Sequence, residues 1–181
     1  MEAQIRRQKL LKLLCATVGE MLLQPTLEEI ERSNLTDVQL AALRYLLCHT
    51  NPTAGEMAEG LHISRAAVSK LLDRLAHKKM LRRLDDYRDR RRTRVELTAE
   101  GKRLVEEVLE REKSRFAEVF ARLSEEELAH LEQGIEAFLR ATLTRVEDVE
   151  LVCLRCGTAH LPTCPGNVIY KTLTGQDKDT V

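Results

Sequence analysis

Three cysteines and one histidine lie close together near the C-terminal end of this 181-residue chain. A CxxC pair is followed after three residues by a histidine and after three more by a third cysteine; these residues are Cys153, Cys156, His160 and Cys164. Tetrahedral zinc accepts three thiolates and one imidazole, and a CxxC turn commonly places two thiolates on one ion. Glycines and prolines in the same stretch are typical of a tight loop. The pattern therefore predicts a metal site, with zinc as the first choice.

The same spacing is compatible with three other interpretations. An iron–sulfur cluster also takes a CxxC pair and a later Cys-Pro, with the histidine or a partner chain as the fourth ligand. A CxxC pair can instead form a redox-active disulfide, in a regulator or in a thiol-redox enzyme. A chance grouping is the last interpretation. The sequence has no thioredoxin-like βαβ frame, paired carboxylates or catalytic triad. We therefore predict that the chain is not an enzyme.

Basic residues are concentrated in the middle of the chain. Lysine plus arginine and aspartate plus glutamate both number 29, but residues 62–94 hold twelve of the basic and four of the acidic ones, leaving 17 and 25 elsewhere. A cationic segment in an otherwise acidic protein attracts a polyanion at one place, without non-specific binding over the whole surface. This charge distribution predicts a nucleic-acid-binding element in this segment.

The stretch from Ile63 to Gly101 reads as a helix followed by a two-stranded hairpin. Ser64 is a suitable N-cap for a helix ending near residue 79, and a shorter capped helix precedes it after a brief turn. Two alternating runs, 80–86 and 92–98, flank an arginine-rich turn. Together these elements form a winged helix-turn-helix. Its second helix enters the major groove of double-stranded DNA, and its hairpin reaches an adjacent groove.

Helical patterns flank this stretch on both sides. Capping signals and apolar residues at helical spacing predict helices over residues 3–23, 26–34, 36–49, 53–61, 99–122 and 124–146. The first and last helices have more apolar side chains than a DNA-binding domain of this size can bury. We therefore expect these helices to form a dimer contact. The sequence has no run of eighteen apolar residues and no cleavage site after its first helix. We therefore expect a cytoplasmic protein with no membrane contact.

The order of these elements, and several motifs, resemble the MarR family of bacterial transcription regulators over about residues 5–145. Asp89-Arg90-Arg91, followed by Leu97-Thr98 and Gly101, matches the family's wing signature DRR…LTxxG. Further matches are Leu35-Thr36 at a helix start and, in the recognition helix, Ser64, Ala67-Val68-Ser69 and Leu72-Asp73-Arg74-Leu75. Two positions depart from the family, which often has glycine where His62 and Lys79 stand.

The resemblance implies a homodimeric regulator, usually a repressor, that binds near-palindromic operators. It places recognition helix 64–79 in the major groove and wing 85–92 in the minor groove. It also implies control by a small-molecule effector or an oxidant that acts between the dimerisation helices and the DNA-binding domain. Cys15 resembles the cysteine of oxidant-sensing relatives and is a candidate redox residue. A lone cysteine in an apolar helical pattern, such as Cys15 or Cys48, is ordinarily a buried reduced thiol.

The recognition helix and the wing carry the predicted DNA contacts. Arg65 and Lys70 are the predicted readers of base edges, because arginine bonds guanine bidentately. Arg74 and the Lys78-Lys79 pair are suited to phosphates, as is the helix N-terminus at Ser64. In the wing, guanidinium groups fit a narrow minor groove, and the resemblance implies that Asp89 orients one of them. The predicted DNA-binding residues are Ser64, Arg65, Ala66, Ser69, Lys70, Arg74, Arg88, Asp89, Arg90 and Arg91. The side chains expected to face inward from this helix are Val68, Leu71, Leu72 and Leu75.

We therefore predict a mainly α (α+β) fold in four parts. They are N-terminal dimerisation helices at 1–34, a winged helix-turn-helix at 35–98, C-terminal dimerisation helices at 99–148, and a Cys/His tail at 149–181. Within the tail, residues 168–170 are expected to form a short strand.

Overall fold

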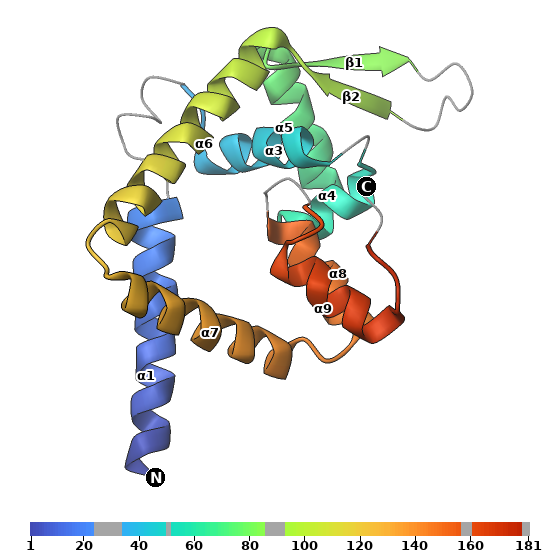
Figure 1. The fold of residues 1–181 in the computed structure, drawn as a ribbon. Coiled ribbons are helices and arrows are strands. Elements are labelled where there is room, and N and C mark those ends of the chain that lie inside the picture. Colours follow the sequence, from blue (N-terminus) through green and yellow to red (C-terminus); the bar gives the residue numbers. More distant parts are fainter. Residues whose placement is uncertain (24–33, 50–51, 86–92, 157–160, 179–181) are drawn as a thin grey trace.

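The fold, seen in a computed structural model of the chain, is mainly helical with a two-stranded antiparallel sheet, as predicted (Figure 1). The structure describes residues 1–23, 34–49, 52–85, 93–156 and 161–178. The helices are α1 (Glu2–Thr17), the π-helical η1 (Val18–Leu23), α3 (Asp37–Cys48), α4 (Ala54–Gly60), α5 (Arg65–His77), α6 (Ala99–Phe120), α7 (Glu125–Thr142), α8 (Val146–Cys156) and α9 (Pro165–Thr174). The strands are β1 (Leu81–Asp85) and β2 (Thr93–Leu97). The helix predicted at 26–34 falls almost wholly outside the described residues.

Side-chain caps begin the helices at the predicted places. Thr36, Thr53 and Ser124 each form a capping box with the residue three positions later. The hydroxyl oxygens of Ser64 and Thr98 each accept a hydrogen bond of 3.1 Å from the backbone N–H three residues on. Each such cap stabilises its helix by about 1 kcal/mol. The predicted starts of α3, α4, α5, α6 and α7 are therefore confirmed.

The winged helix-turn-helix, called the reader below, consists of α3, α4, α5 and the β1–β2 hairpin. The start of α6 packs against it. Its core is a cluster of buried apolar side chains: Leu35, Ala42, Leu43, Tyr45, Met57, Val68, Leu71, Leu72, Leu75, Met80, Leu81, Val95 and Val105. In the hairpin, Leu81 pairs with Leu97 and Arg83 with Val95. This register turns Leu81 and Val95 into the core, so the hairpin leaves the reader at a fixed angle.

Two polar contacts fasten the long helix α6 to other elements. The Arg44 guanidinium on α3 donates two hydrogen bonds, of 2.5 and 3.1 Å, to the Glu112 carboxylate on α6. Glu112 is buried, with 8% of its surface exposed. The Arg115 Nε donates to the Leu22 carbonyl oxygen at the end of η1 over 3.1 Å. Helix α6 therefore links the reader to the N-terminal helices.

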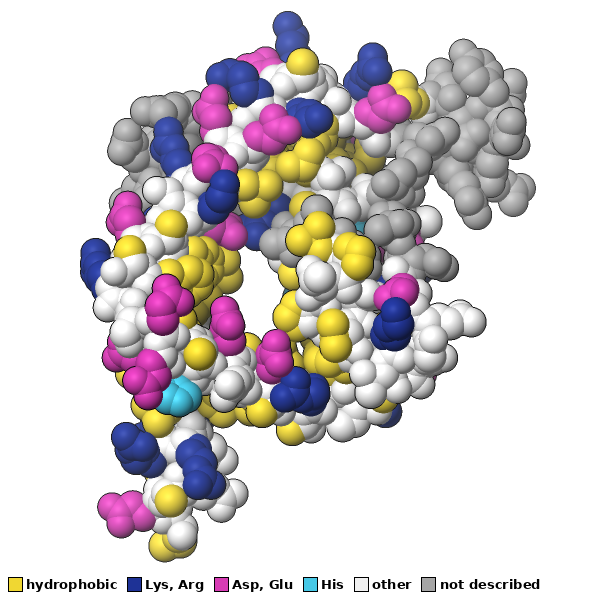
Figure 2. Space-filling view, in the orientation of Figure 1, with side chains coloured by type: hydrophobic (Ala, Val, Ile, Leu, Met, Phe, Trp, Pro, Cys, Tyr) yellow, Lys and Arg dark blue, Asp and Glu magenta, His cyan; other side chains and the backbone are white. Residues whose placement is uncertain are grey.

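Helices α1 and α7 bury no residue within one protomer. Figure 1 shows α1 extending away from the rest of the molecule, and Figure 2 shows an opening through the molecule bordered by apolar side chains. Large apolar side chains more than a third exposed on these two helices, on η1 and at the end of α6 are Ile5, Leu10, Leu11, Leu13, Leu14, Met21, Leu23, Val119, Phe120, Ile135 and Phe138. No helix in the described ranges has the length and apolar character needed to cross a membrane.

The C-terminal tail forms two helices, so the predicted strand at 168–170 is wrong. These residues lie inside α9, which has Pro165 in its first turn and ends at Gly175, whose φ of +79° is the left-handed conformation typical of helix ends. Ile169 packs in a small second core with Leu143. A run of three apolar residues is too short to distinguish a strand from one face of a helix.

Candidate nucleic-acid interface

Helix α5 has the two faces predicted for a recognition helix. Val68, Leu71, Leu72 and Leu75 are buried in the reader's core. Ser64, Arg65, Ala66, Ser69, Lys70 and Arg74 are exposed. The apolar residues recur at intervals of three and four, so one stripe faces the core and the opposite face stays in solvent. The division of faces is confirmed, and contact of the exposed face with DNA stays a prediction.

The three cations of this exposed face, Arg65, Lys70 and Arg74, form no ion pair with another described residue. The Arg65 guanidinium extends back toward α4, where its Nη2 would lie 3.3 Å from a Cβ atom added at Gly55. Glycine at position 55 therefore leaves room for this side chain beside the N-terminal end of α4. Since no described carboxylate neutralises these cations, they give the exposed face of α5 a positive electrostatic potential.

Other cations of the basic segment are already engaged. The Arg83 guanidinium pairs with the Asp73 carboxylate at 2.5 Å, and Arg82 pairs across the hairpin with Glu96 at 3.0 Å. The Lys78 ammonium donates to the backbone carbonyl of Asn34 and, over 3.0 Å, to the Gln39 side chain. Lys78 therefore ties the end of α5 to the start of α3, a role that the predicted phosphate contact did not include.

His62 and Lys79, which replace frequent glycines of the MarR pattern, both have left-handed backbones. Their φ angles are +55° and +60°. His62 lies in the turn between α4 and α5, and Lys79 follows α5, where its N–H donates to the Ala76 carbonyl over 2.9 Å. Glycine adopts this conformation without steric cost, whereas other residues do so at about 1–2 kcal/mol. The two turns therefore have the left-handed geometry that favours glycine, although His62 and Lys79 are not glycines.

The second half of the wing motif joins α6 to the base of the hairpin. The Thr98 hydroxyl donates to the Lys79 carbonyl over 2.7 Å and accepts from the Gly101 N–H. A Cβ atom at Gly101 would lie 2.0 Å from the Met80 carbonyl oxygen, so only glycine fits there. Leu97-Thr98 and Gly101 therefore set where the wing leaves the reader. The wing-tip residues predicted to contact DNA, Arg88, Asp89, Arg90 and Arg91, lie outside the described residues.

The comparisons with known proteins agree with this geometry. A sequence model of the MarR family matches residues 33–92, which contain the helix-turn-helix and the first strand of the wing hairpin. The HTH-type transcriptional repressor MdtR of Bacillus subtilis is 36% identical over 102 residues, which cover 56% of this chain and 66% of MdtR. This chain belongs to the MarR family of transcription regulators. MdtR is named as a repressor, and the alternative of a thiol-redox enzyme finds no support in these comparisons.

Solved structures of MarR-family relatives have the same fold. A mutant of MepR from S. aureus matches with a TM-score of 0.64 and 26% identity, covering 75% of this chain and 97% of that one. The S. aureus MepR–DNA complex matches with a TM-score of 0.52 and 29% identity, covering 64% of this chain and 87% of that one. The winged helix fold is therefore shown, and about a quarter of this MarR-family chain lies outside the first match.

The predicted metal ligands of this MarR-family chain lie on α8 and at the start of α9. Cys153 and Cys156 are in α8 rather than in a turn, Cys164 is the N-cap of α9, and His160 lies outside the described residues. Within the described ranges, no three His, Cys, Asp or Glu side chains are gathered closely enough to hold a metal ion. The predicted metal site is therefore not preformed in the part of the tail that the structure describes.

The two cysteines outside the tail differ from the prediction of lone buried thiols. Cys15 is exposed, because none of the described elements buries any residue of α1. Cys48, the last residue of α3, is half-buried. Burial raises the pKa of its thiol, the Arg44 guanidinium lowers it, and the nearby Cys156 thiol raises it. Cys156 of the tail is therefore within electrostatic range of Cys48, which no sequence spacing indicates.

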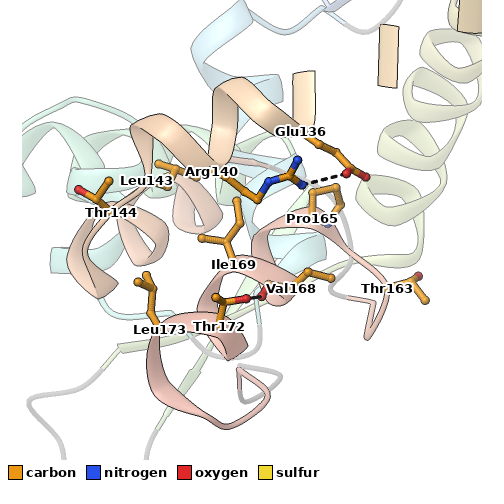
Figure 3. Close-up of a pocket in the computed structure, with 10 residues that line it drawn as sticks. All are labelled: Glu136, Arg140, Leu143, Thr144, Thr163, Pro165, Val168, Ile169, Thr172 and Leu173. Carbon is orange, nitrogen blue, oxygen red and sulfur yellow. Dashed lines mark hydrogen bonds and ion pairs between the residues drawn. The ribbon is translucent and has the colours of Figure 1, made fainter. Parts of the chain in front are cut away.

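A pocket of about 280 Å³ lies between the end of α7 and α9 (Figure 3). Its lining residues are Glu136, Arg140, Leu143, Thr144, Thr163, Pro165, Val168, Ile169, Thr172 and Leu173. The Arg140 guanidinium at its edge is paired with Glu136 at 3.0 Å, so its charge is largely neutralised. The remaining lining is mostly aliphatic and threonine side chains, which suits an apolar, uncharged small molecule.

Proposed function

We propose that this protein is a repressor that binds near-palindromic operator DNA as a homodimer, in the cytoplasm. The observation that carries the proposal is the exposed face of α5, on which three cations stand without a described carboxylate partner. Such a helix face provides both base-edge readers and phosphate contacts. MepR has been solved in complex with DNA and MdtR is named as a repressor, which supports the same assignment here.

The exposed apolar side chains of α1, η1, the end of α6 and α7 support the homodimer. Full burial of one large apolar side chain contributes about 1.5–3 kcal/mol, so half-exposed ones contribute about 1 kcal/mol each when a partner covers them. Residues such as Leu13, Met21 and Phe138 are 48–68% exposed. A surface of this extent gives on the order of 10 kcal/mol, comparable with the 4–15 kcal/mol cost of association.

The DNA assignment is tested by selecting operator sequences from a random library with the purified protein and measuring affinities by fluorescence anisotropy. Arg65→Ala and Lys70→Ala should each weaken operator binding by about 5- to 150-fold. Arg74→Ala should weaken all sequences alike and reduce the salt dependence by about one ion. Lys113→Ala, an exposed lysine of α6, is the matched control and should change little. Unchanged affinity in all three α5 variants would exclude this helix face as the reader.

The wing assignment needs its own variant, since its tip lies outside the described residues. Arg91→Ala should weaken operator binding strongly while the circular dichroism spectrum and the melting temperature stay as in the native protein. An unchanged affinity would contradict the minor-groove role of residues 85–92.

The dimer is tested by sedimentation equilibrium of full-length variants. Phe138→Asp places a charge on the exposed apolar face of α7 and should raise the dimer dissociation constant by at least tenfold. Leu161→Asp, which changes an apolar residue of the tail with 58% exposure, is the matched control. Equal effects of both substitutions, or none from Phe138→Asp, would exclude α7 from the dimer contact.

We further infer that a small-molecule effector of this regulator binds in the pocket between α7 and α9. Its aliphatic lining and its neutralised guanidinium favour an uncharged apolar compound over an anion. Leu173→Arg fills the pocket with a charged side chain. It should abolish the rise in melting temperature that apolar compounds from a screen give to the native protein. Retention of the whole stabilisation by Leu173→Arg would place the effector elsewhere.

A further inference from the structure

We propose that Cys153 and Cys164 are a redox modification site, which a hydroperoxide oxidises to a disulfide that fixes α9 to α8. This pair differs from the CxxC pair that the sequence spacing indicates, because its second member is the N-cap of another helix, α9. Formation of the disulfide requires no DNA, so it can be tested whether or not the protein binds an operator.

Gly166 shows how closely the two sulfur atoms approach each other. A Cβ atom added at Gly166 would lie 3.0 Å from the Cys153 Sγ and 3.7 Å from the Cys164 Sγ. The distance between the two sulfur atoms is therefore at most the sum of these two values. A disulfide bond is about 2 Å long, and a cysteine moves its sulfur by changing its side-chain rotamer. Side-chain rotation with a small movement of the start of α9 can therefore bring the two sulfur atoms together.

Helices α8 and α9 pack against each other around this pair (Figure 1). Val149 of α8 and Ile169 of α9 belong to one small buried core, and Cys153 packs against it. The Cys164 N–H donates to the Leu161 carbonyl over 3.0 Å, which holds the start of α9 in a turn. Both thiols are reduced and half-buried. Since packing already places both backbones, closing the bridge costs little further chain entropy.

Cys156 is the other candidate partner of Cys153, and helix geometry disfavours it. The two cysteines are three positions apart in α8. Residues at this spacing have Cβ atoms about 5–6 Å apart, whereas a disulfide holds its Cβ atoms about 3.5–4.5 Å apart. A bridge within the CxxC pair would therefore distort the end of α8, whereas Cys164 approaches Cys153 from a separate element.

The order of attack follows from the surroundings of the two thiols. Burial raises the pKa of the Cys153 thiol more than the nearby Lys178 ammonium lowers it. Since the thiolate is the nucleophile, Cys153 is a poor first reactant at neutral pH. Cys164 lies between two exposed residues, Thr163 and Pro165. We therefore assign the first attack to Cys164.

The reaction has two steps. The Cys164 thiolate attacks one oxygen of the hydroperoxide, the O–O bond breaks, and Cys164 becomes a sulfenic acid. The other oxygen takes up a proton and leaves as water or as an alcohol. The Cys153 sulfur then attacks the Cys164 sulfur, the S–O bond breaks, and the hydroxide leaves as water with the proton of the Cys153 thiol. The two sulfur atoms lose two electrons in all, which reduce the peroxide.

The experiment is treatment of the full-length, reduced protein with hydrogen peroxide, followed by trypsin digestion without reductant and mass spectrometry. Cleavage after lysine and arginine gives peptides 146–155 and 156–171. The first contains Cys153, and the second contains both Cys156 and Cys164. The native protein should lose two of its five thiols and give these two peptides as one disulfide-linked species.

Single substitutions identify the partner of Cys153. Cys156→Ser should give the linked peptides as fast as the native protein does. Cys153→Ser and Cys164→Ser should give none, although the latter keeps the CxxC pair intact. Cys15→Ser is the matched control, because this exposed cysteine of α1 is outside the tail, and it should react as the native protein does.

The link between α8 and α9 has a readout of its own. Lys171 lies within α9, so trypsin cleaves after it in the folded protein only when α9 unwinds locally. In a brief digestion, peroxide-treated native protein should release residues 172–181 at least threefold more slowly than reduced protein does. In Cys164→Ser protein, the same treatment should leave this rate unchanged.

Four results would overturn the proposal. Linked peptides that are lost in Cys156→Ser and kept in Cys164→Ser would assign the disulfide to the CxxC pair. A bridge confined to peptide 156–171 would assign it to Cys156 and Cys164. Linked peptides found only in protein that migrates as a dimer without reductant would place the bridge between two protomers. Retention of all five thiols, or equal release of residues 172–181 by both forms, would exclude a bridge that fixes α9.

Discussion

Gly101→Ala tests the structural role assigned to the second half of the wing motif. A methyl group at this position would lie 2.0 Å from the Met80 carbonyl oxygen and 2.9 Å from its carbonyl carbon. Both atoms are backbone, so they cannot rotate away as a flexible side chain does. The Thr98 hydroxyl, which bonds the Lys79 carbonyl and the Gly101 N–H, holds the two segments together at this contact.

The expected loss of stability is about 2 kcal/mol. The start of α6 must separate from Met80, just before β1, by about 1 Å. Overpacking of this kind typically costs about 1–3 kcal/mol, and we expect the upper value for a backbone contact. Alanine is the better helix former by about 1 kcal/mol, which offsets part of that cost. Because the shift occurs where the hairpin leaves the reader, the wing should also be displaced, and operator affinity should fall with it.

The assay is urea denaturation followed by circular dichroism, with operator affinity measured on the same samples below the unfolding transition. Gly134→Ala is the matched control, since this glycine lies within α7 and an added Cβ atom meets no atom within 4 Å. The same substitution should there raise the free energy of unfolding by about 1 kcal/mol. A Gly101→Ala protein as stable as the native one, with unchanged affinity, would refute the reasoning about the motif.

Three further predictions concern the turn after α5, the α3–α6 link and a helix cap. Lys79→Gly should raise the free energy of unfolding by about 0.5–1 kcal/mol in urea denaturation, because it relieves a left-handed backbone at some entropic cost; a loss of stability would contradict this. Glu112→Gln leaves Arg44 without its carboxylate partner and should cost about 2 kcal/mol in the same assay, whereas a neutral effect would show that the pair contributes nothing net. The pKa of Glu56 is lowered below its ordinary value by hydrogen bonds from Thr53, so its stabilising contribution is present at neutral pH and is lost as pH falls through the folded-state pKa. The melting temperatures of native and Glu56→Gln protein should therefore converge on acidification, and a constant difference would argue against this link.

Local signals in the sequence were sufficient to predict the reader. Ser64 and Thr98 are capping residues whose hydrogen bonds span three positions, and the faces of α5 follow from apolar residues at intervals of three and four. Interactions of this range depend on neighbouring residues alone, so the sequence contains them directly. The MarR resemblance, and not a local signal, indicated a preference for glycine where His62 and Lys79 stand, and both backbones are left-handed.

Contacts between distant parts of the chain were not predictable in this way. Arg44 and Glu112 are 68 positions apart, and nothing in the spacing of either indicates the other. Likewise, Cys15 is exposed because the described elements leave α1 uncovered, which a helical apolar pattern alone does not reveal.

The tail shows this division most clearly. By itself, the sequence determined that thiols are concentrated after residue 149, because residue types and their spacing are local properties. Only the tertiary structure decided that residues 168–170 are helical, since Ile169 packs with Leu143 while Val168 stays exposed, as on the two faces of a helix. It also decided that Leu154 of α8 packs against the reader's core, because this apolar contact joins residues that are far apart in the chain.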